Sequence, residues 1–551
     1  MSDKERENGA VDGESAAKSG VTDRSVSEEN NASIAHSASG VRRFAGTAFL
    51  LTLASYLCQP NYDPVFFEQL TIGRYISAHQ QVPHRFIWSA ISAEHSWISL
   101  SIPFQALLGT VFGHWDFKGL LVLKLLLYVV AVFAIFQAYR RAAVDTFFAG
   151  LLATVVAAGI LVRGEFTPEL LGVIGFSVVL ALLLEPAERK IASAAAITAV
   201  IAALFSIAPP AALVSTIGVF AAVLFSAGRP GSIGGGGSLL PRPLAVLVTA
   251  AVTFMALVWP FAGQFSAELK QRSNELLRLP EFQPAALTFG YGAAGLILTL
   301  LLAAILSLAV RRPDWRILLF LPLLFPAADF LLPYGLIGAG FFTCSIWSRN
   351  SASQQSKIGE GIARLQASLG RIPEPGLSFL LICFSIVNIF SLLQTPVAYI
   401  GMPVIEADRV MKEGYLGPVL TESPAVGYLL HRFSDQNGSP RKLVYAGRTD
   451  LSLAPGQAVK AAAAIRTAAD WKEQLAAVDP QVVIVRTSQR LALELKKEAA
   501  SGPNSEWRLV SVGGRNEETK LDGPDPESAL PRDYQPAISW AVFVKNPRRH
   551  D

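Results

Sequence analysis

Long apolar runs alternate with short polar segments through most of the chain, from residue 44 to residue 395. A run of about 20 apolar residues is enough for a helix to cross the hydrocarbon core of a bilayer. The runs lie at 44–59, 119–139, 145–162, 168–185, 191–207, 210–227, 243–261, 285–309, 316–332, 334–347 and 376–395. The pattern therefore predicts an α-helical polytopic membrane protein with about 11 transmembrane helices.

The short polar segments between these runs carry most of the basic residues of the region, for example the pairs Arg140 with Arg141 and Arg311 with Arg312. Basic residues collect in the cytoplasmic loops of membrane proteins. If the N-terminus is cytoplasmic, nearly every such cluster falls inside, and an odd number of spans places the C-terminal part outside. The sequence thus predicts a multi-pass plasma-membrane protein with an extracytoplasmic C-terminal domain.

The two ends of the chain have a different pattern from the apolar region. Residues 1–43 are polar and aperiodic, which predicts a disordered cytoplasmic N-terminus ahead of a transmembrane domain over 44–395. From 396 to 551 short strand-like and helical segments alternate, which predicts a small α/β domain with a three-layer core. Strands are expected in "RKLVYAG", "PQVVIVRT", "WRLVSVG" and "ISWAVFVKN", and helices over 468–478 and 487–500.

Composition agrees with a membrane location. Of 551 residues, 51% are hydrophobic and only 16% are charged, whereas a soluble protein carries more charge. The net charge of +4 is small and says little about partners. The apolar runs make membrane lipids the expected partners, and no nucleic-acid partner is expected. The three cysteines lie in or beside apolar runs, and their spacing matches neither a metal site nor a redox pair.

The segment 60–118 is predicted to form one large outer loop after the first span. Within it, 96–113 is apolar but contains Pro103, and a crossing there would move the Arg140 pair to the outside. This segment is therefore expected to be an interfacial helix that lies along the membrane. Lys124 follows near the outer end of the second span, where its ammonium can reach the headgroups.

Two acids, Asp63 and Glu68, open the outer loop directly after the first span. Acids at the boundary between lipid and water are costly to desolvate. A carboxylate there can act as a general base or hold a divalent cation. Asp63 also precedes Pro64, so it can equally cap the N-terminus of a helix that begins at the proline. The sequence leaves both roles open.

The stretch "DPVFFEQLTIGRYISAHQQVP", followed by "SWISLSIPFQALL", resembles the first outer loop of bacterial polytopic membrane proteins that are similar to the GT-C glycosyltransferases. The positions that match here are Asp63, Pro64, Gly73, Ile76, Val82, Pro83 and Trp97. Val65 and Gln69 stand where that family has a second Asp and a His. Further matches along the chain are Arg163, Pro260, Gly263, Glu281, Pro284, Gly427, Tyr428, Leu429, Gly447, Arg448 and Asp450.

The resemblance implies transfer of a sugar from a polyprenyl-phosphate donor to an acceptor in the cell envelope, at the outer face of the bacterial inner membrane. Asp63 or Glu68 would then take the proton of the acceptor hydroxyl, and Arg163 would contact the donor phosphate. Glu281 and Asp329 would line the same cavity. Arg163 can instead reach lipid headgroups, Glu281 can cap a helix, and Asp329 can form a hydrogen bond within the bundle. A requirement for a divalent cation stays open.

Two other functions remain as alternatives. The protein can be a binding or scaffolding component of envelope polysaccharide assembly that keeps the fold without catalysis, and the missing His position favours this. A transporter fits less well, because the acids cluster at the outer boundary and the sequence shows no internal repeat. The outer loop also contains four histidines, His79, His84, His95 and His114, whose spacing favours solvated side chains over a metal site.

Overall fold

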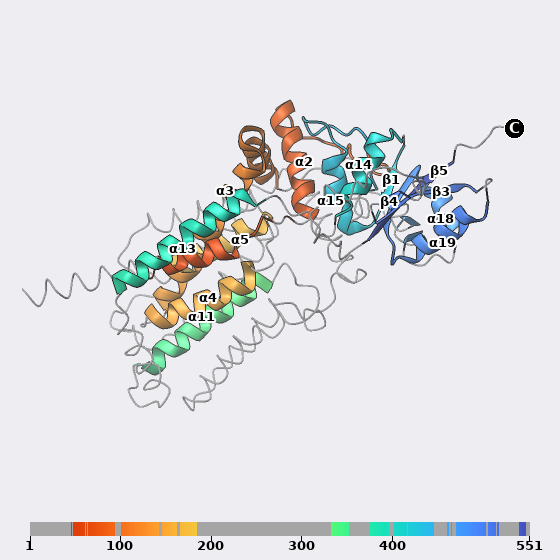
Figure 1. Cartoon of the computed structure of the whole chain (residues 1–551). Helices are drawn as coiled ribbons and strands as arrows, with labels where there is room; N and C mark the ends of the chain where they lie inside the picture. The colour runs from red at the N-terminus through yellow and green to blue at the C-terminus, as the bar shows by residue number, and fades with distance from the viewer. Residues whose placement is uncertain are drawn as a thin grey trace, which may run out of the picture.

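In a computed structural model the chain is largely helical, with a small sheet in its C-terminal part (Figure 1). The structure describes residues 46, 48–60, 62, 64–93, 101–142, 146–161, 166–183, 332–351, 374–395, 402–415, 417–445, 460–461, 464–465, 470–502, 505–513, 515–516 and 539–546.

Except for the start of α3, the helices of the apolar region begin and end close to the predicted runs. They are α3 (Ile102–Ala142), α4 (Thr146–Leu161), α5 (Glu169–Leu183), α11 (Leu332–Ser351) and α13 (Glu374–Gln394), together with a shorter helix over Ala48–Leu57. Among the described residues, α3 alone is both long and apolar enough to cross a membrane. The helical architecture is thus confirmed, while the number of spans stays a prediction. The runs between 191 and 332 lie outside the described residues.

Helix α3 is two helical arms joined at a kink. Asp116 interrupts it with φ 53° and ψ −155°, which is far from helical geometry. The first arm covers most of the predicted interfacial segment, and the second arm covers the predicted span 119–139. Pro103 lies in the first turn of the helix, where its missing N–H has no helical partner to lose, so it begins the first arm rather than breaking it.

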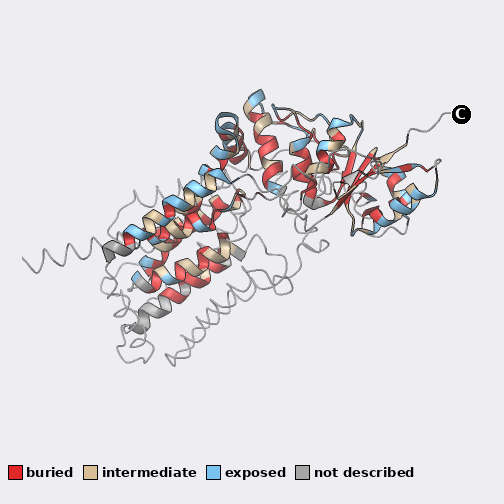
Figure 2. Ribbon diagram, in the orientation of Figure 1, coloured by how far each residue is buried: buried red, intermediate tan, exposed pale blue. Residues whose placement is uncertain are grey.

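The second arm of α3 packs against α4, α5 and α11 in a bundle (Figure 1). Buried Tyr139 donates its hydroxyl to the carbonyl of Ile337 across 3.0 Å, which ties α3 to α11. Thr52 and Ser385 share a hydrogen bond of 2.8 Å that ties the helix Ala48–Leu57 to α13. The outer face of α13 is exposed and apolar (Figure 2); it carries Phe379, Leu380, Phe384, Ile386, Val387 and Phe390.

The C-terminal part contains a five-stranded mixed sheet in the order β1-β2-β5-β3-β4. The strands are β1 (Val419–Thr421), β2 (Val482–Arg486), β3 (Trp507–Val512), β4 (Arg515–Asn516) and β5 (Trp540–Lys545). Strands β1 and β2 are parallel, and the other neighbours are antiparallel. The helices of this part are α14 (Val404–Lys412), α15 (Ser423–Arg432), α18 (Trp471–Val478) and α19 (Arg490–Ala500).

Alternate residues of the central strands point to opposite faces of the sheet, as the pleat requires. Val482 and Ile484 belong to the hydrophobic core that includes α14 and α15 and continues into the helical bundle. Val483 and Val485 belong to a second core with α18 and α19. Helices therefore cover both faces of the sheet, and the predicted strands in 480–487, 507–513 and 538–546 are confirmed.

The predicted strand "RKLVYAG" is wrong in the described residues of that segment, 441–445. Its pairing is limited to Val444, which forms parallel bridges with Val419 on one side and Ser89 on the other. Val444 donates its N–H to the carbonyl of Trp88 at 3.0 Å, and Ala90 donates to the carbonyl of Val444 at 3.2 Å. The segment that follows α2 (Pro64–His79) therefore borders the C-terminal sheet.

Candidate functional site

Of the five residues that sequence analysis singled out for chemistry, the structure describes Glu68. Its side chain is half-buried on α2. The other four, Asp63, Arg163, Glu281 and Asp329, lie outside the described residues. Their predicted roles therefore stay predictions.

Helix α2 lies between the first arm of α3 and helix α15 (Figure 1). Phe66, Phe67 and Leu70 are fully buried and supply its apolar contacts. Gly73 meets the backbone of α3 directly, because a Cβ at this position would lie 2.0 Å from the carbonyl oxygen of Gln105. Small residues allow such close helix packing. Helix α2 therefore contacts both the apolar bundle and the C-terminal part.

Lys124 lies at the end of the bundle that faces α2, and it is fully buried. Its ammonium donates to the carbonyl of Gln59 across 2.7 Å and lies 5.1 Å from the centre of the Tyr62 ring. The expectation that it reaches out to the headgroups is wrong, because the backbone carbonyl just after the first helix holds it inside. The sequence does indicate that Lys124 is unusual, because burying a charged lysine inside an apolar run is costly unless the charge has a structural or functional role.

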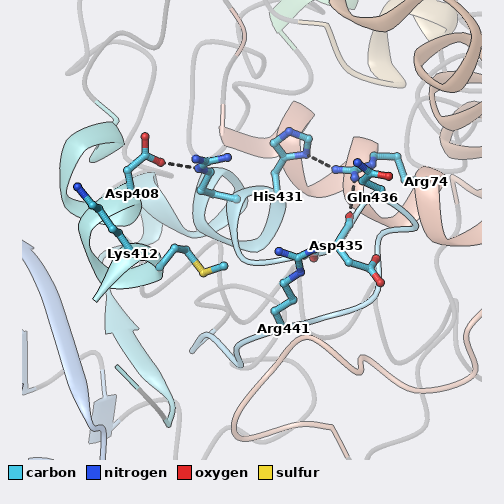
Figure 3. A pocket seen from close by; sticks show the side chains of 10 residues that line it. Arg74, Asp408, Lys412, His431, Asp435, Gln436 and Arg441 are labelled. Atoms are coloured by element: carbon cyan, nitrogen blue, oxygen red, sulfur yellow. Dashed lines mark hydrogen bonds and ion pairs between the residues drawn. The ribbon is translucent and has the colours of Figure 1, made fainter. Parts of the chain in front are cut away.

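A pocket of about 530 Å³ opens between α2, α14 and α15 (Figure 3). Its walls combine Arg74 of α2 with residues of the C-terminal part. That second set consists of Asp408, Met411, Lys412, His431, Arg432, Ser434, Asp435, Gln436 and Arg441. Sequence analysis missed this pocket, because it joins one residue of α2 to side chains more than 300 positions away in the sequence.

Positive charge prevails in the pocket. Arg432 forms an ion pair with Asp408 at 2.5 Å, so these two charges offset each other. The Asp435 carboxylate accepts the backbone N–H groups of Asn437 and Ser439, both at 2.8 Å, and thereby stabilises a turn. No acidic side chain pairs with the remaining three cations of the pocket, Arg74, Lys412 and Arg441, in the part of the chain that the structure describes.

Three contacts orient Arg74. One guanidinium nitrogen donates to the carbonyl of Asp435 at 2.5 Å, and the other lies 3.3 Å from Nδ1 of His431. The guanidinium carbon sits 5.2 Å from the centre of the Phe112 ring, a favourable cation–π distance. Burial lowers the pKa of Arg74, while the charges of Asp435 and Asp116 act in the opposite direction. Its Nε is buried and finds no acceptor among the described residues.

His431 forms the inner wall of the pocket and is neutral. A guanidinium only donates, so Nδ1 of the imidazole must accept from Arg74, and the proton of the neutral ring sits on Nε2. The ring packs against Phe67, whose centroid is 5.5 Å away. Burial, followed by the charges of Arg74 and Arg432, lowers the pKa of His431 to about 3. The histidine therefore adds no charge to the pocket near neutral pH.

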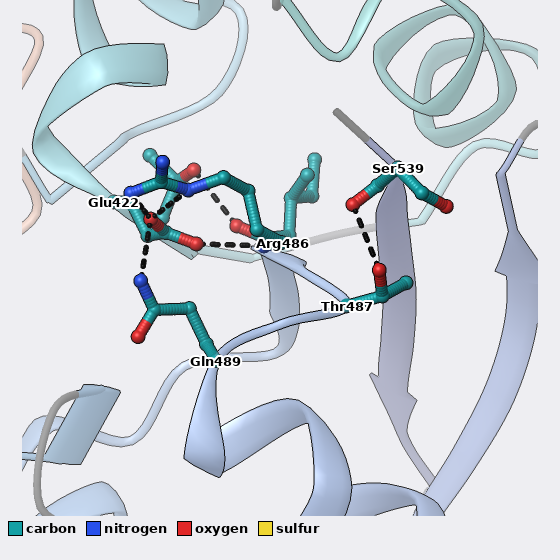
Figure 4. Close-up of polar contacts among 7 residues, drawn as sticks. Glu422, Arg486, Thr487, Gln489 and Ser539 are labelled. Carbon is teal, nitrogen blue, oxygen red and sulfur yellow. Dashed lines mark hydrogen bonds and ion pairs between the residues drawn. The ribbon is translucent and has the colours of Figure 1, made fainter. Parts of the chain in front are cut away.

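A second polar cluster lies where β1 and β2 end (Figure 4). Buried Glu422 accepts the backbone N–H of Arg486 at 2.6 Å and pairs with its guanidinium at 2.5 Å. It also accepts the side-chain amide of Gln489 at 3.0 Å. Because these bonds occupy both carboxylate oxygens, Glu422 serves to join the strand ends to α15 and α19 rather than to perform chemistry.

The four histidines between residues 79 and 114 show no arrangement typical of a metal site in the described part of this segment. His79, His84 and His114 are exposed, and His95 lies outside the described residues. Over the described ranges, no group of three or more His, Cys, Asp or Glu side chains is arranged to hold a metal ion.

Comparison of the sequence with models of known protein families found no match, and comparison with curated proteins found no match either.

Proposed function

We propose that the protein is a membrane glycosyltransferase of the GT-C type, which transfers a sugar from a polyprenyl-phosphate donor to an envelope acceptor outside the membrane. The observation that carries the proposal is the position of α2. This helix places a half-buried acid, Glu68, where an apolar helical bundle meets the polar C-terminal part. A donor with a lipid tail and a charged head needs such a boundary.

The apolar part of the molecule supports a membrane location for this chemistry. Helix α3 is long and apolar enough to cross a bilayer, and α13 turns a row of large apolar side chains outward. Exposed apolar surface of this kind is unfavourable in water. In the proposal these faces contact lipid, and Arg163 contacts the donor phosphate at the outer end of the bundle.

The proposed reaction needs one base and one cation. Glu68 or Asp63 accepts the proton of the acceptor hydroxyl while the oxygen of that hydroxyl bonds to the anomeric carbon of the sugar. The bond between that carbon and the phosphate oxygen breaks, and polyprenyl phosphate leaves with the electron pair. Displacement from the opposite side inverts the anomeric configuration. Arg163, which the resemblance assigns to the donor phosphate, stabilises the charge that develops on the leaving phosphate.

Binding without catalysis is the second candidate, and Gln69 favours it. This residue stands where the resembled family has a His, and its side-chain oxygen accepts the Gln105 amide across 2.6 Å. A glutamine cannot transfer a proton as a histidine does. At this position the chain therefore has a contact between α2 and α3 in place of a titratable group.

Turnover by the full chain in nanodiscs, with a panel of polyprenyl-phosphate sugars, tests the proposal. We expect Glu68→Gln or Asp63→Asn to lower the rate at least about 100-fold, as loss of a general base does. Glu473→Gln is the matched control, since Glu473 is an exposed acid on α18. Arg163→Gln is expected to lower the rate, with Arg140→Gln, which removes an exposed arginine of α3, as its control.

The two candidate functions give different results in this experiment. Donor binding without turnover in the wild-type protein, unchanged by substitution of either acid, would support the binding protein. Absence of both binding and turnover with every donor would reject both candidates.

A further inference from the structure

The pocket between α2, α14 and α15 has cations that the fold does not neutralise. Arg432 and Asp408 pair with each other, and the Asp435 carboxylate accepts the backbone N–H groups of a turn. Lys412 and Arg441 are exposed at the pocket wall and form neither an ion pair nor a side-chain hydrogen bond with the described residues (Figure 3). Their charges therefore do little for the stability of the fold itself.

Arg74 shows that the pocket is more than a patch of surface charge. Its guanidinium is held by the Asp435 carbonyl and the Phe112 ring, so its position does not depend on a ligand. At the same time its Nε is buried without an acceptor over the described residues. A buried donor without a partner is costly. The guanidinium is therefore held in the pocket wall as a fixed positive charge.

The side of the pocket formed by His431 also suits an anion. Nδ1 of the ring accepts from Arg74, which leaves the N–H on Nε2 as a further donor of the neutral imidazole. The pocket thus combines guanidinium, ammonium and imidazole donors within a cavity of about 530 Å³. Guanidinium groups bind phosphate oxygens in pairs, and an ammonium adds a point charge.

We propose that this pocket is a binding site for a phosphate group, held by Arg74, Lys412 and Arg441. The phosphate belongs either to a soluble phosphate ester or to a lipid headgroup, because both present the same oxygens. The site is separate from the acid of α2 to which the transfer reaction is assigned, and the inference stands whether or not the protein is a glycosyltransferase.

Such a ligand would join two distant parts of the chain. Arg74 comes from the outer loop, and Lys412 and Arg441 come from the C-terminal part. Binding would therefore hold α2 against α14 and α15 more firmly. The three cations already line the pocket in the free protein, and a bound phosphate would connect them through its oxygens.

The test uses the full chain in nanodiscs of zwitterionic phosphatidylcholine, titrated with inorganic phosphate in a calorimeter. We expect saturable binding that weakens as the salt concentration rises. Arg441→Gln and Lys412→Gln should each weaken binding about tenfold, the usual loss for a hydrogen bond to a charged group.

Arg490→Gln and Lys496→Gln are the matched controls, since each removes the same charge from an exposed position on α19. They should leave the dissociation constant unchanged. Thermal unfolding without phosphate should be the same for all four variants, which would show that the pocket variants remain folded. Absence of saturable binding, or an equal loss in the control variants, would overturn the proposal.

A second titration distinguishes the source of the phosphate. If the natural ligand is a lipid headgroup, nanodiscs that contain anionic phosphatidylglycerol should abolish binding of inorganic phosphate, and Arg441→Gln should remove this competition. If the ligand is soluble, phosphate should bind equally in both kinds of nanodisc. Either result supports a phosphate site.

Discussion

Arg74 of α2 donates to Nδ1 of His431 in α15 across 3.3 Å. Burial of the imidazole, followed by the charges of Arg74 and Arg432, lowers the pKa of His431, so the ring is neutral near neutral pH. In the unfolded chain the histidine titrates near pH 6.5, and in the folded protein near pH 3. Between these values the unfolded chain binds a proton that the folded protein does not. The contribution of His431 to stability is therefore fully present above pH 6.5 and is lost as the pH falls toward 3.

We predict that His431→Gln makes the midpoint of thermal unfolding less sensitive to pH between about 6.5 and about 4. Glutamine does not titrate, and its oxygen can still accept from Arg74. Carboxylates titrate in the lower part of this range, so wild type and variant are compared at each pH. His114→Gln, which removes an exposed histidine, should keep the wild-type slope. Equal slopes for His431→Gln and wild type would show that the histidine is not kept neutral.

Gly109 of α3 provides a test of the close crossing with α2. A Cβ added there would lie 2.1 Å from the carbonyl oxygen of Gly73, so Gly109→Ala must push the helices apart. We predict a loss of about 1–3 kcal/mol in the free energy of unfolding. One turn further along, Gly113 has no atom within 4 Å of an added Cβ. Gly113→Ala should stabilise the protein by about 0.5–1 kcal/mol through helix propensity, and the same sign for both variants would contradict the crossing.

The turn at Gly438 should control how the C-terminal part docks on α2. Gly438 has φ +79°, and an added Cβ would lie 2.5 Å from the backbone N of Tyr75. Gly414 also has a positive φ, +68°, but open space around it. Gly414→Ala should cost about 1–2 kcal/mol for its backbone conformation alone. Gly438→Ala should cost more and should also speed hydrogen exchange in α2, an effect that Gly414→Ala should lack.

Removing the buried carboxylate of Glu422 should strongly destabilise the C-terminal part. Glu422→Gln breaks its pairing with Arg486 and leaves that guanidinium partly buried beside a neutral amide. We predict a loss of about 3 kcal/mol in chemical unfolding of the full chain. Glu494→Gln breaks an exposed pair with Lys497 and should cost about 0–1 kcal/mol. Comparable losses in the two variants would mean that the Glu422 cluster contributes little.

Local patterns predicted the elements well. The apolar runs at 145–162 and 168–185 correspond to α4 and α5, because the apolar composition that predicts a helix lies within the helix itself. The strand-like segments predicted in the C-terminal part correspond to β2, β3 and β5 in the same way. Strand β1 was missed, because three residues carry too little pattern, and its pairing with β2 comes from the tertiary fold.

The pocket could not be predicted for a related reason. Arg74 reads as one of many surface arginines until α15 is placed beside α2, and His431 reads as solvated until Phe67 and Phe112 are placed against its ring. Gly73 is the one local signal of the crossing, because a glycine within a helix allows a neighbouring helix to approach closely. Contacts between segments this distant leave no periodic trace in either segment.

The pairing of Ser89 with Val444 has a consequence for how the protein is made. About 350 residues separate the two sides of this contact, as the bond from Trp88 to Gly438 also illustrates. During translation the segment that contains Ser89 is therefore synthesised long before the C-terminal strands that it borders. A C-terminal fragment produced alone would lack that border and would present unsatisfied backbone groups to other chains. We therefore expect the fragment to aggregate unless residues 64–93 are supplied with it.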